Sequence, residues 1–164
     1  MNIIGKSLKY GNNINTDIIS PPLYMELEIK EAAKYAMAPI DNNFSKTCKK
    51  GDIFVAENNL GSGSSRETAP LILKELGIKT IVAKSFARIF YRNCINLGIL
   101  AIQCEKTENI DMFDIIEIDY INGIIINQTK KEEYKCERIP NHIMEIIKED
   151  GLIGYLKAKK NSKK

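Results

Sequence analysis

The sequence has little of what marks several classes of protein. Its 164 residues include no tryptophan and one histidine, His142, and no two of its four cysteines form a C-x-x-C pair. Zinc or iron–sulfur ligation by this chain alone is therefore disfavoured, because such sites draw on clustered cysteines and histidines. We expect free thiols in a reducing compartment at Cys48, Cys94, Cys104 and Cys136.

Long apolar segments and a strong charge of either sign are also missing. No segment approaches the ~20 apolar residues that span a bilayer, and Lys6 and Lys9 interrupt the N-terminal apolar segment that a signal peptide needs. The net charge is +3, and much of the excess lies in residues 157–164. A nucleic-acid-binding face, which gathers basic residues, is not indicated. We expect a cytoplasmic protein with one domain at 1–156 and a basic, frayed tail at 157–164.

What the chain does have is a strand, a glycine–serine turn and a helix in direct succession. Apolar residues 53–56 predict the strand, residues 61–67 form the turn with the sequence GSGSSRE, and residues 69–76 predict a helix that ends at Gly77. The start of a helix presents unpaired N–H groups and a positive dipole. This order therefore indicates a place where a negative group can be held.

The side chains of the turn suit an anion as well. Gly63 allows close approach of the backbone, Ser64 and Ser65 supply hydroxyls, and Arg66 supplies paired donors for a carboxylate. An inert loop with Ser65 as the helix N-cap is the alternative, and the anion site is favoured. A phosphate loop is disfavoured because no lysine follows the second glycine, and a dinucleotide fingerprint because Arg66 stands where a third glycine belongs.

Strands and helices alternate along the first two thirds of the chain. The pattern predicts a strand over 3–8, a loop over 10–20, a short helix from Ile29, and strands at 78–83 and 99–102 on either side of a helix over 85–97. Such alternation predicts an α/β fold with a mainly parallel central sheet and right-handed crossovers. The turn at 61–67 should then lie at the carboxyl ends of the strands, where such sheets bind ligands.

The last third predicts a C-terminal β-hairpin and a helix. Apolar and polar residues alternate over 113–120, and Asn122-Gly123 separates them from an apolar segment at 124–126. Residues 140–150 predict the closing helix. Arg88 and Arg92, four residues apart in the helix predicted over 85–97, are either surface charge or part of a partly buried anion or interface site.

Several of these motifs occur together in a known family. They are Thr16-Asp17 with Ile18-Ile19 and a following proline, Gly51-Asp52-Ile53, the turn at 61–67, the segment SFARIFYRN at 85–93, and Asn96-Leu97-Gly98. In order and spacing the chain resembles the small subunits of the aconitase superfamily up to about Gly151-Leu152. Within that superfamily it is most similar to the small subunits of 3-isopropylmalate dehydratase and of homoaconitase-type enzymes. The resemblance implies a swivelling β/β/α domain of the aconitase/isopropylmalate isomerase small-subunit type.

The resemblance also implies a function. The chain would be part of a hydro-lyase that is active only with a large subunit, and that partner would carry a [4Fe–4S] cluster while this chain binds no cofactor or metal. The reaction would interconvert 2-isopropylmalate and 3-isopropylmalate in leucine biosynthesis. The alternatives are a related hydro-lyase acting on citramalate, dimethylmalate or homoaconitate, and a non-catalytic anion-binding module. The stoichiometry of the complex and self-association of the isolated chain stay open.

By the same resemblance, the turn at 61–67 would hold the catalytic residues. Ser64 would be the base, acting as an alkoxide, with Ser65, Arg66 and the N–H groups at the helix start stabilising its charge. Arg66 would also contact a substrate carboxylate. Asp17 matches a family position that helps to order the site.

The resemblance further assigns substrate binding to Gly63 and to a loop made of Tyr24, Met25, Glu26 and Leu27. Homoaconitase-type chains commonly carry an arginine near position 26 to pair with an additional carboxylate, which Glu26 would repel. Homoaconitate and citrate are therefore disfavoured. Met25 and Leu27 would flank a branched aliphatic group. If the alignment is shifted by one residue, Glu26 faces solvent instead.

Overall fold

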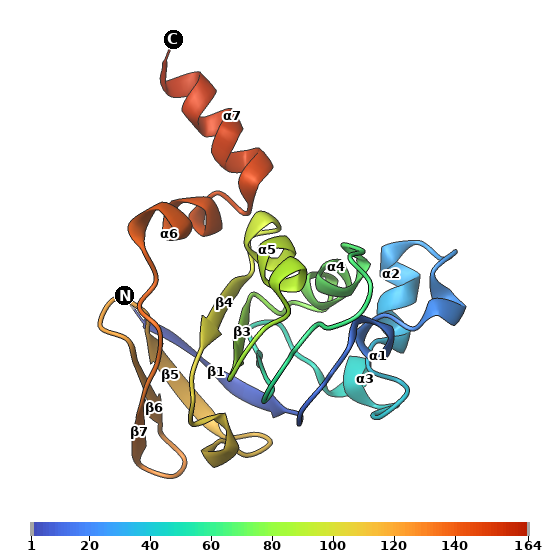
Figure 1. The fold of residues 1–164 in the computed structure, drawn as a ribbon, viewed down its shortest axis with the longest axis horizontal. Coiled ribbons are helices and arrows are strands. Elements are labelled where there is room, and N and C mark those ends of the chain that lie inside the picture. Colours follow the sequence, from blue (N-terminus) through green and yellow to red (C-terminus); the bar gives the residue numbers. More distant parts are fainter. Residues whose placement is uncertain (1, 164) are drawn as a thin grey trace.

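The fold is described for residues 2–163 by a computed structural model (Figure 1). Its strands are β1 (Asn2–Lys9), β2 (Ile53–Val55), β3 (Thr80–Ala83), β4 (Leu100–Gln103), β5 (Ile115–Asp119), β6 (Ile124–Asn127) and β7 (Glu132–Lys135). Its α-helices are α1 (Thr16–Ile19), α2 (Ile29–Ala32), α3 (Phe44–Thr47), α4 (Thr68–Glu75), α5 (Arg88–Asn96), α6 (Asn141–Lys148) and α7 (Leu152–Ser162). Three short 3-10 helices complete the described chain: η1 (Pro22–Tyr24), η2 (Ala33–Tyr35) and η3 (Thr107–Asn109). None of the helices in 2–163 is long and apolar enough to cross a membrane.

The strands form one seven-stranded sheet with a parallel and an antiparallel half. Its order is β4-β3-β2-β1-β5-β6-β7. Strands β1 to β4 pair in parallel, and β1, β5, β6 and β7 pair antiparallel. The alternating pattern of strands and helices thus correctly predicts the parallel half, and the predicted hairpin is β5–β6. Strand β7 was missed because only Tyr134 among its four residues is apolar and buried.

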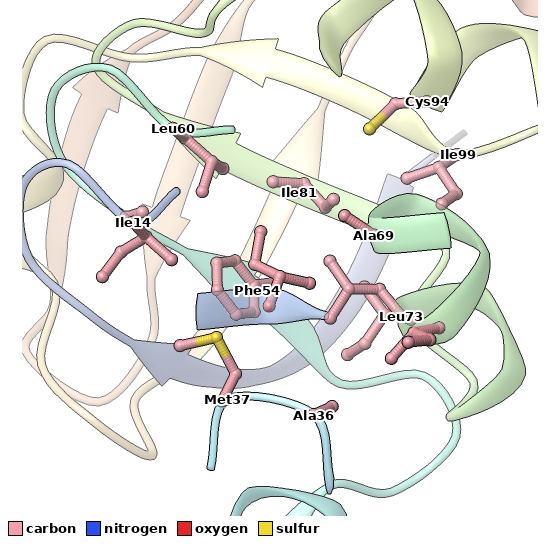
Figure 2. Packing of buried hydrophobic residues seen from close by; sticks show 14 of the residues in the cluster. Ile14, Ala36, Met37, Phe54, Leu60, Ala69, Leu73, Ile81, Cys94 and Ile99 are labelled. Atoms are coloured by element: carbon pink, nitrogen blue, oxygen red, sulfur yellow. The ribbon is translucent and has the colours of Figure 1, made fainter. Parts of the chain in front are cut away.

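Both faces of the parallel half are covered. All three residues of β2 are fully buried, with Phe54 in a cluster that includes Ile81 and Leu73, and with Ile53 and Val55 in a second cluster on the other side. Figure 2 shows Phe54 and Ile81 of the sheet facing Leu73 of α4. Burial on both faces explains why β2 is a continuous apolar run instead of an alternating one.

The helix predicted over 85–97 begins later than the sequence suggests. Its first residue is Arg88, because the preceding segment stays extended and Phe86 forms a parallel bridge with Leu60. Within the helix, Ile89 is 50% exposed, whereas Phe90 is buried.

Short helices also form where loops or a frayed tail were expected. Helix α1 lies in the predicted loop 10–20 because the side chain of Asn15 caps it by accepting from the N–H of Ile18 at 2.9 Å. At the other end of the chain, α7 continues to Ser162, so the expectation of a frayed segment from residue 157 is wrong up to that residue. No residue of α7 is buried, and Figure 1 shows it extending away from the sheet. The division into a domain at 1–156 and a tail at 157–164 stays a prediction.

The four cysteines are free thiols, as expected. Burial raises the pKa of each above the ordinary value of 9.0, to about 12 for Cys48 and Cys136. Thiols of the unfolded chain ionise near pH 9. The contribution of the buried, protonated thiols to the free energy of unfolding is therefore fully present below that pH and is lost as the pH rises through 12. We therefore expect the Tm to be flat from about pH 7 to 8.5 and to fall above about pH 9.

Scanning calorimetry of the wild-type chain and of Cys94→Ala measures this dependence. Cys94 is fully buried, so the variant loses one such thiol and should show a shallower alkaline decline, even though its Tm at neutral pH is lower. Identical alkaline slopes in the two proteins would show that thiol burial is not the cause.

Candidate active site

The glycine–serine turn lies beyond the carboxyl end of β2, beside the loop that follows β1. The N–H of Thr16 donates to the carbonyl oxygen of Ser62 at 2.9 Å, and that of Gly61 donates to Ile14 at 2.7 Å. Gly61 has φ +84°, and a Cβ there would lie 2.0 Å from Cγ of Phe90. Only glycine fits this position, so the turn is held tightly between α5 and the β1 loop.

Arg66 joins three side chains at the exposed end of this turn. Its Nε donates to Oγ of Ser64 at 2.9 Å, and its backbone N–H reaches the same oxygen at 3.4 Å. Its Nη2 donates to Oδ1 of Asp17 at 3.2 Å, and its Nη1 lies 3.3 Å from Sδ of Met25. Ser64 itself is exposed. A cationic donor beside a hydroxyl favours the deprotonated form of that hydroxyl, so the arrangement suits a serine that gives up its proton.

The contacts of Ser65 and the start of α4 differ from those expected from the sequence. The carbonyl oxygen of Ser65 accepts from Nδ2 of Asn93 on α5 at 3.2 Å. The N-cap of α4 is Glu67, which makes no side-chain cap hydrogen bond, so the alternative in which Ser65 caps the helix is wrong. The helix begins only at Thr68, and the backbone N–H on Oγ of Ser64 belongs to Arg66 and not to the first turn of the helix.

The predicted substrate loop lies next to Arg66 through Met25. Tyr24, the last residue of η1, is half-buried and stacks on Tyr35 with ring centroids 3.8 Å apart. Glu26 and Leu27 are exposed. The structure thus brings Met25, Arg66 and Ser64 together, whereas Tyr24 packs on Tyr35 and no hydrogen bond joins Glu26 or Leu27 to these three among the described residues.

Residues of the segment 85–93 form hydrogen bonds with the turn and with the residues just before it. The hydroxyl of Ser85 accepts from the N–H of Asn59 at 2.7 Å, and Asn93 binds the turn as described above. Arg88 and Arg92 are both exposed. Their exposure agrees with surface charge or an interface, and both interpretations of this arginine pair stay predictions.

Two residues to which the sequence argument gave no role contact the turn directly. Thr16 is 3% exposed, and its Oγ1 accepts from the N–H of Ser64 at 3.1 Å. Asn93 is the second, through Ser65. Both belong to motifs that carried the family resemblance, which was the available signal, although neither residue type indicates this contact by itself.

No candidate metal site is found in the part of the chain that the structure describes. Over residues 2–163, no three side chains of histidine, cysteine, aspartate or glutamate are grouped so that they could hold a metal ion.

Comparison with known proteins identifies the family of the chain. The family described as the aconitase C-terminal domain matches residues 10–107. The 3-isopropylmalate dehydratase small subunit of Clostridium beijerinckii is 46% identical over 159 residues, which cover 96% of this chain and 99% of that protein. The corresponding subunit of Caldanaerobacter subterraneus is 48% identical over 157 residues, or 94% of this chain and 98% of that protein.

A solved structure extends the agreement to three dimensions. The crystal structure of 3-isopropylmalate dehydratase from Methanocaldococcus jannaschii superposes with a TM-score of 0.93 at 43% identity, covering 99% of this chain and 98% of that one. The predicted α/β fold of the small-subunit type is thereby confirmed. The chain therefore belongs to the family of aconitase C-terminal domains, and within it to the small subunits of 3-isopropylmalate dehydratase.

Proposed function

We infer that this chain is the small subunit of a 3-isopropylmalate dehydratase, a hydro-lyase that interconverts 2-isopropylmalate and 3-isopropylmalate in leucine biosynthesis. The single observation that carries this proposal is the contact at 2.9 Å between Nε of Arg66 and Oγ of Ser64. This contact and the near full-length similarity to dehydratase small subunits support Ser64 as the base that the reaction needs.

The proposed chemistry starts at the carbon next to a substrate carboxylate. Oγ of Ser64, as an alkoxide, takes the proton; the electrons of that C–H bond form the double bond, and hydroxide leaves the neighbouring carbon. Reversal of these steps on the other carbon adds water back. A serine hydroxyl is a poor base at neutral pH, so the guanidinium and backbone N–H of Arg66 must stabilise its anion.

Asp17, Ser65 and Gly63 would assist this base. The carboxylate of Asp17 holds Nη2 of Arg66, so that Nε stays directed at Ser64. We propose that the exposed hydroxyl of Ser65 meets the substrate and that the absence of a side chain at Gly63, whose φ is +104°, lets the substrate approach the backbone.

A partner must complete the site. Relatives are named small subunits, which implies a larger companion, and we propose that this large subunit carries the [4Fe–4S] cluster and closes over the exposed Ser64. Leu23, Met25 and Leu27 are 82%, 45% and 43% exposed, and Met25 contacts Arg66. Exposed apolar side chains of this kind suit a surface that another protein covers. We expect the complex to work in the cytoplasm.

The substrate test follows from the loop beside Arg66. Met25 and Leu27 provide apolar surface for a branched group, and Glu26 opposes an additional carboxylate. The isopropyl group adds two methyl groups to the single methyl of citramalate, so we expect kcat/KM for 2-isopropylmalate to exceed that for citramalate by about tenfold. The assay uses the chain assembled with its large subunit on 2-isopropylmalate, citramalate, dimethylmalate and homoaconitate.

Two outcomes of this assay would oppose the proposal. A preference for homoaconitate would overturn the role given to Glu26. Binding of these acids by the chain alone, with no turnover in the presence of a large subunit, would favour the non-catalytic anion-binding module.

A further inference from the structure

The loops after β1 and β2 keep the register of the strands that precede them. Lys9 faces Val55 in the parallel pair, and further along Asn12 contacts Asn58 and Asn13 contacts Asn59. Every one of these pairs is separated by the same 46 residues. The two loops therefore run side by side beyond the sheet.

The last residue in this register is Thr16, which forms hydrogen bonds with the residues on both sides of Gly63. At the same offset, the N–H of Thr16 donates to the carbonyl oxygen of Ser62 at 2.9 Å, and Oγ1 of Thr16 accepts from the N–H of Ser64 at 3.1 Å. Gly63 between them has φ +104°, and a Cβ at this position would lie 3.2 Å from Oγ1 of Thr16. The threonine hydroxyl thus touches the bend that sets the direction of Ser64.

A closed ring of contacts results. Thr16 holds the backbone of Ser64, the next residue Asp17 holds Arg66, and Arg66 holds Oγ of Ser64. Helix α1 thus contacts both the backbone of Ser64 and the guanidinium of Arg66. A shift of Thr16 therefore changes the position of the Ser64 hydroxyl relative to Arg66.

We infer that Thr16 is a positioning residue for the reaction, acting through Ser64 by fixing its backbone so that Oγ meets Arg66. This inference rests on the proposed function. A base that is displaced by a fraction of an ångström loses rate more than substrate affinity. Displacement from the guanidinium also raises the pKa of the serine, which moves the rise of kcat with pH to higher pH.

Thr16→Val tests the inference because valine keeps the shape and removes the acceptor. In the assembled dehydratase we expect kcat to fall about 10- to 100-fold with little change in KM. The ascending limb of the pH profile should shift upward, and the amide hydrogen of Ser64 should exchange faster. Thr16→Ser, which retains the hydroxyl, should restore kcat to within about threefold of wild type.

The matched control is Thr107→Val. Thr107 is fully buried in η3 and its hydroxyl has no hydrogen-bond partner within residues 2–163, so this variant should leave kcat and the pH profile unchanged. A Thr16→Val complex with wild-type kcat and pH profile, or a loss that Thr16→Ser does not restore, would overturn the inference. If instead the wild-type complex fails to turn over 2-isopropylmalate, the proposed function itself fails, and if Ser64→Ala retains full activity, the proposed role of Ser64 as the base fails.

Discussion

Replacing Ser64 by alanine should lower kcat of the assembled dehydratase by about 10²- to 10⁴-fold, the range expected for loss of a general base. The substitution removes the oxygen that accepts from Nε and the backbone N–H of Arg66. Folding should be unaffected, because the Ser64 side chain is exposed and fills no core position. Steady-state kinetics and gel filtration with the large subunit measure the two effects separately.

Ser62→Ala is the matched control for this experiment. Ser62 lies two residues away in the same turn, and it contacts Thr16 through its carbonyl oxygen, which alanine retains. We expect nearly wild-type kcat. If Ser64→Ala assembles and turns over as fast as Ser62→Ala, the hydroxyl of Ser64 is not the base.

The second large effect is expected from Arg66→Lys. An ammonium group cannot contact Ser64, Asp17 and Met25 at once, as the guanidinium does. We expect kcat to fall about 10²- to 10³-fold, comparable to the loss of one oxyanion-hole donor. Loss of the guanidinium raises the pKa of the serine, so the ascending limb of the pH profile should move to higher pH.

Arg138→Lys provides the comparison for Arg66→Lys. Arg138 is exposed in the segment between β7 and α6, and its replacement should change neither kcat nor the pH profile. An Arg66→Lys complex whose pH profile coincides with that of Arg138→Lys would show that Arg66 does not tune the base, whatever the loss in rate.

The sequence predicts the parallel half of the fold and the chemistry of the turn for identifiable reasons. Strand β2 is an unbroken apolar run because it is buried on both faces, and Gly77, which follows α4, has the positive φ angle that favours glycine. The pairing of Ser64 with Arg66 was expected from the family resemblance, and the structure places Nε of Arg66 2.9 Å from Oγ of Ser64.

What sequence reasoning missed depends on contacts between distant segments. The hydroxyl of Thr16 meets Ser64 across 48 residues, and β7 joins the sheet although it carries little apolar sequence. The segment before Arg88 stays extended because Phe86 pairs with Leu60, which overrides the helical pattern. Local propensity cannot report such tertiary contacts.

The most direct test of the account follows the proton itself. The substrate is 2-isopropylmalate deuterated at the carbon from which Ser64 is proposed to take the proton. It is incubated with the assembled wild-type and Ser64→Ala complexes under single-turnover conditions. Mass spectrometry of product fragments should show that the label leaves its original carbon in the wild-type reaction and stays on that carbon with Ser64→Ala over the same period. Removal of the label from that carbon by the Ser64→Ala complex at the wild-type rate would contradict a role of Ser64 as the base.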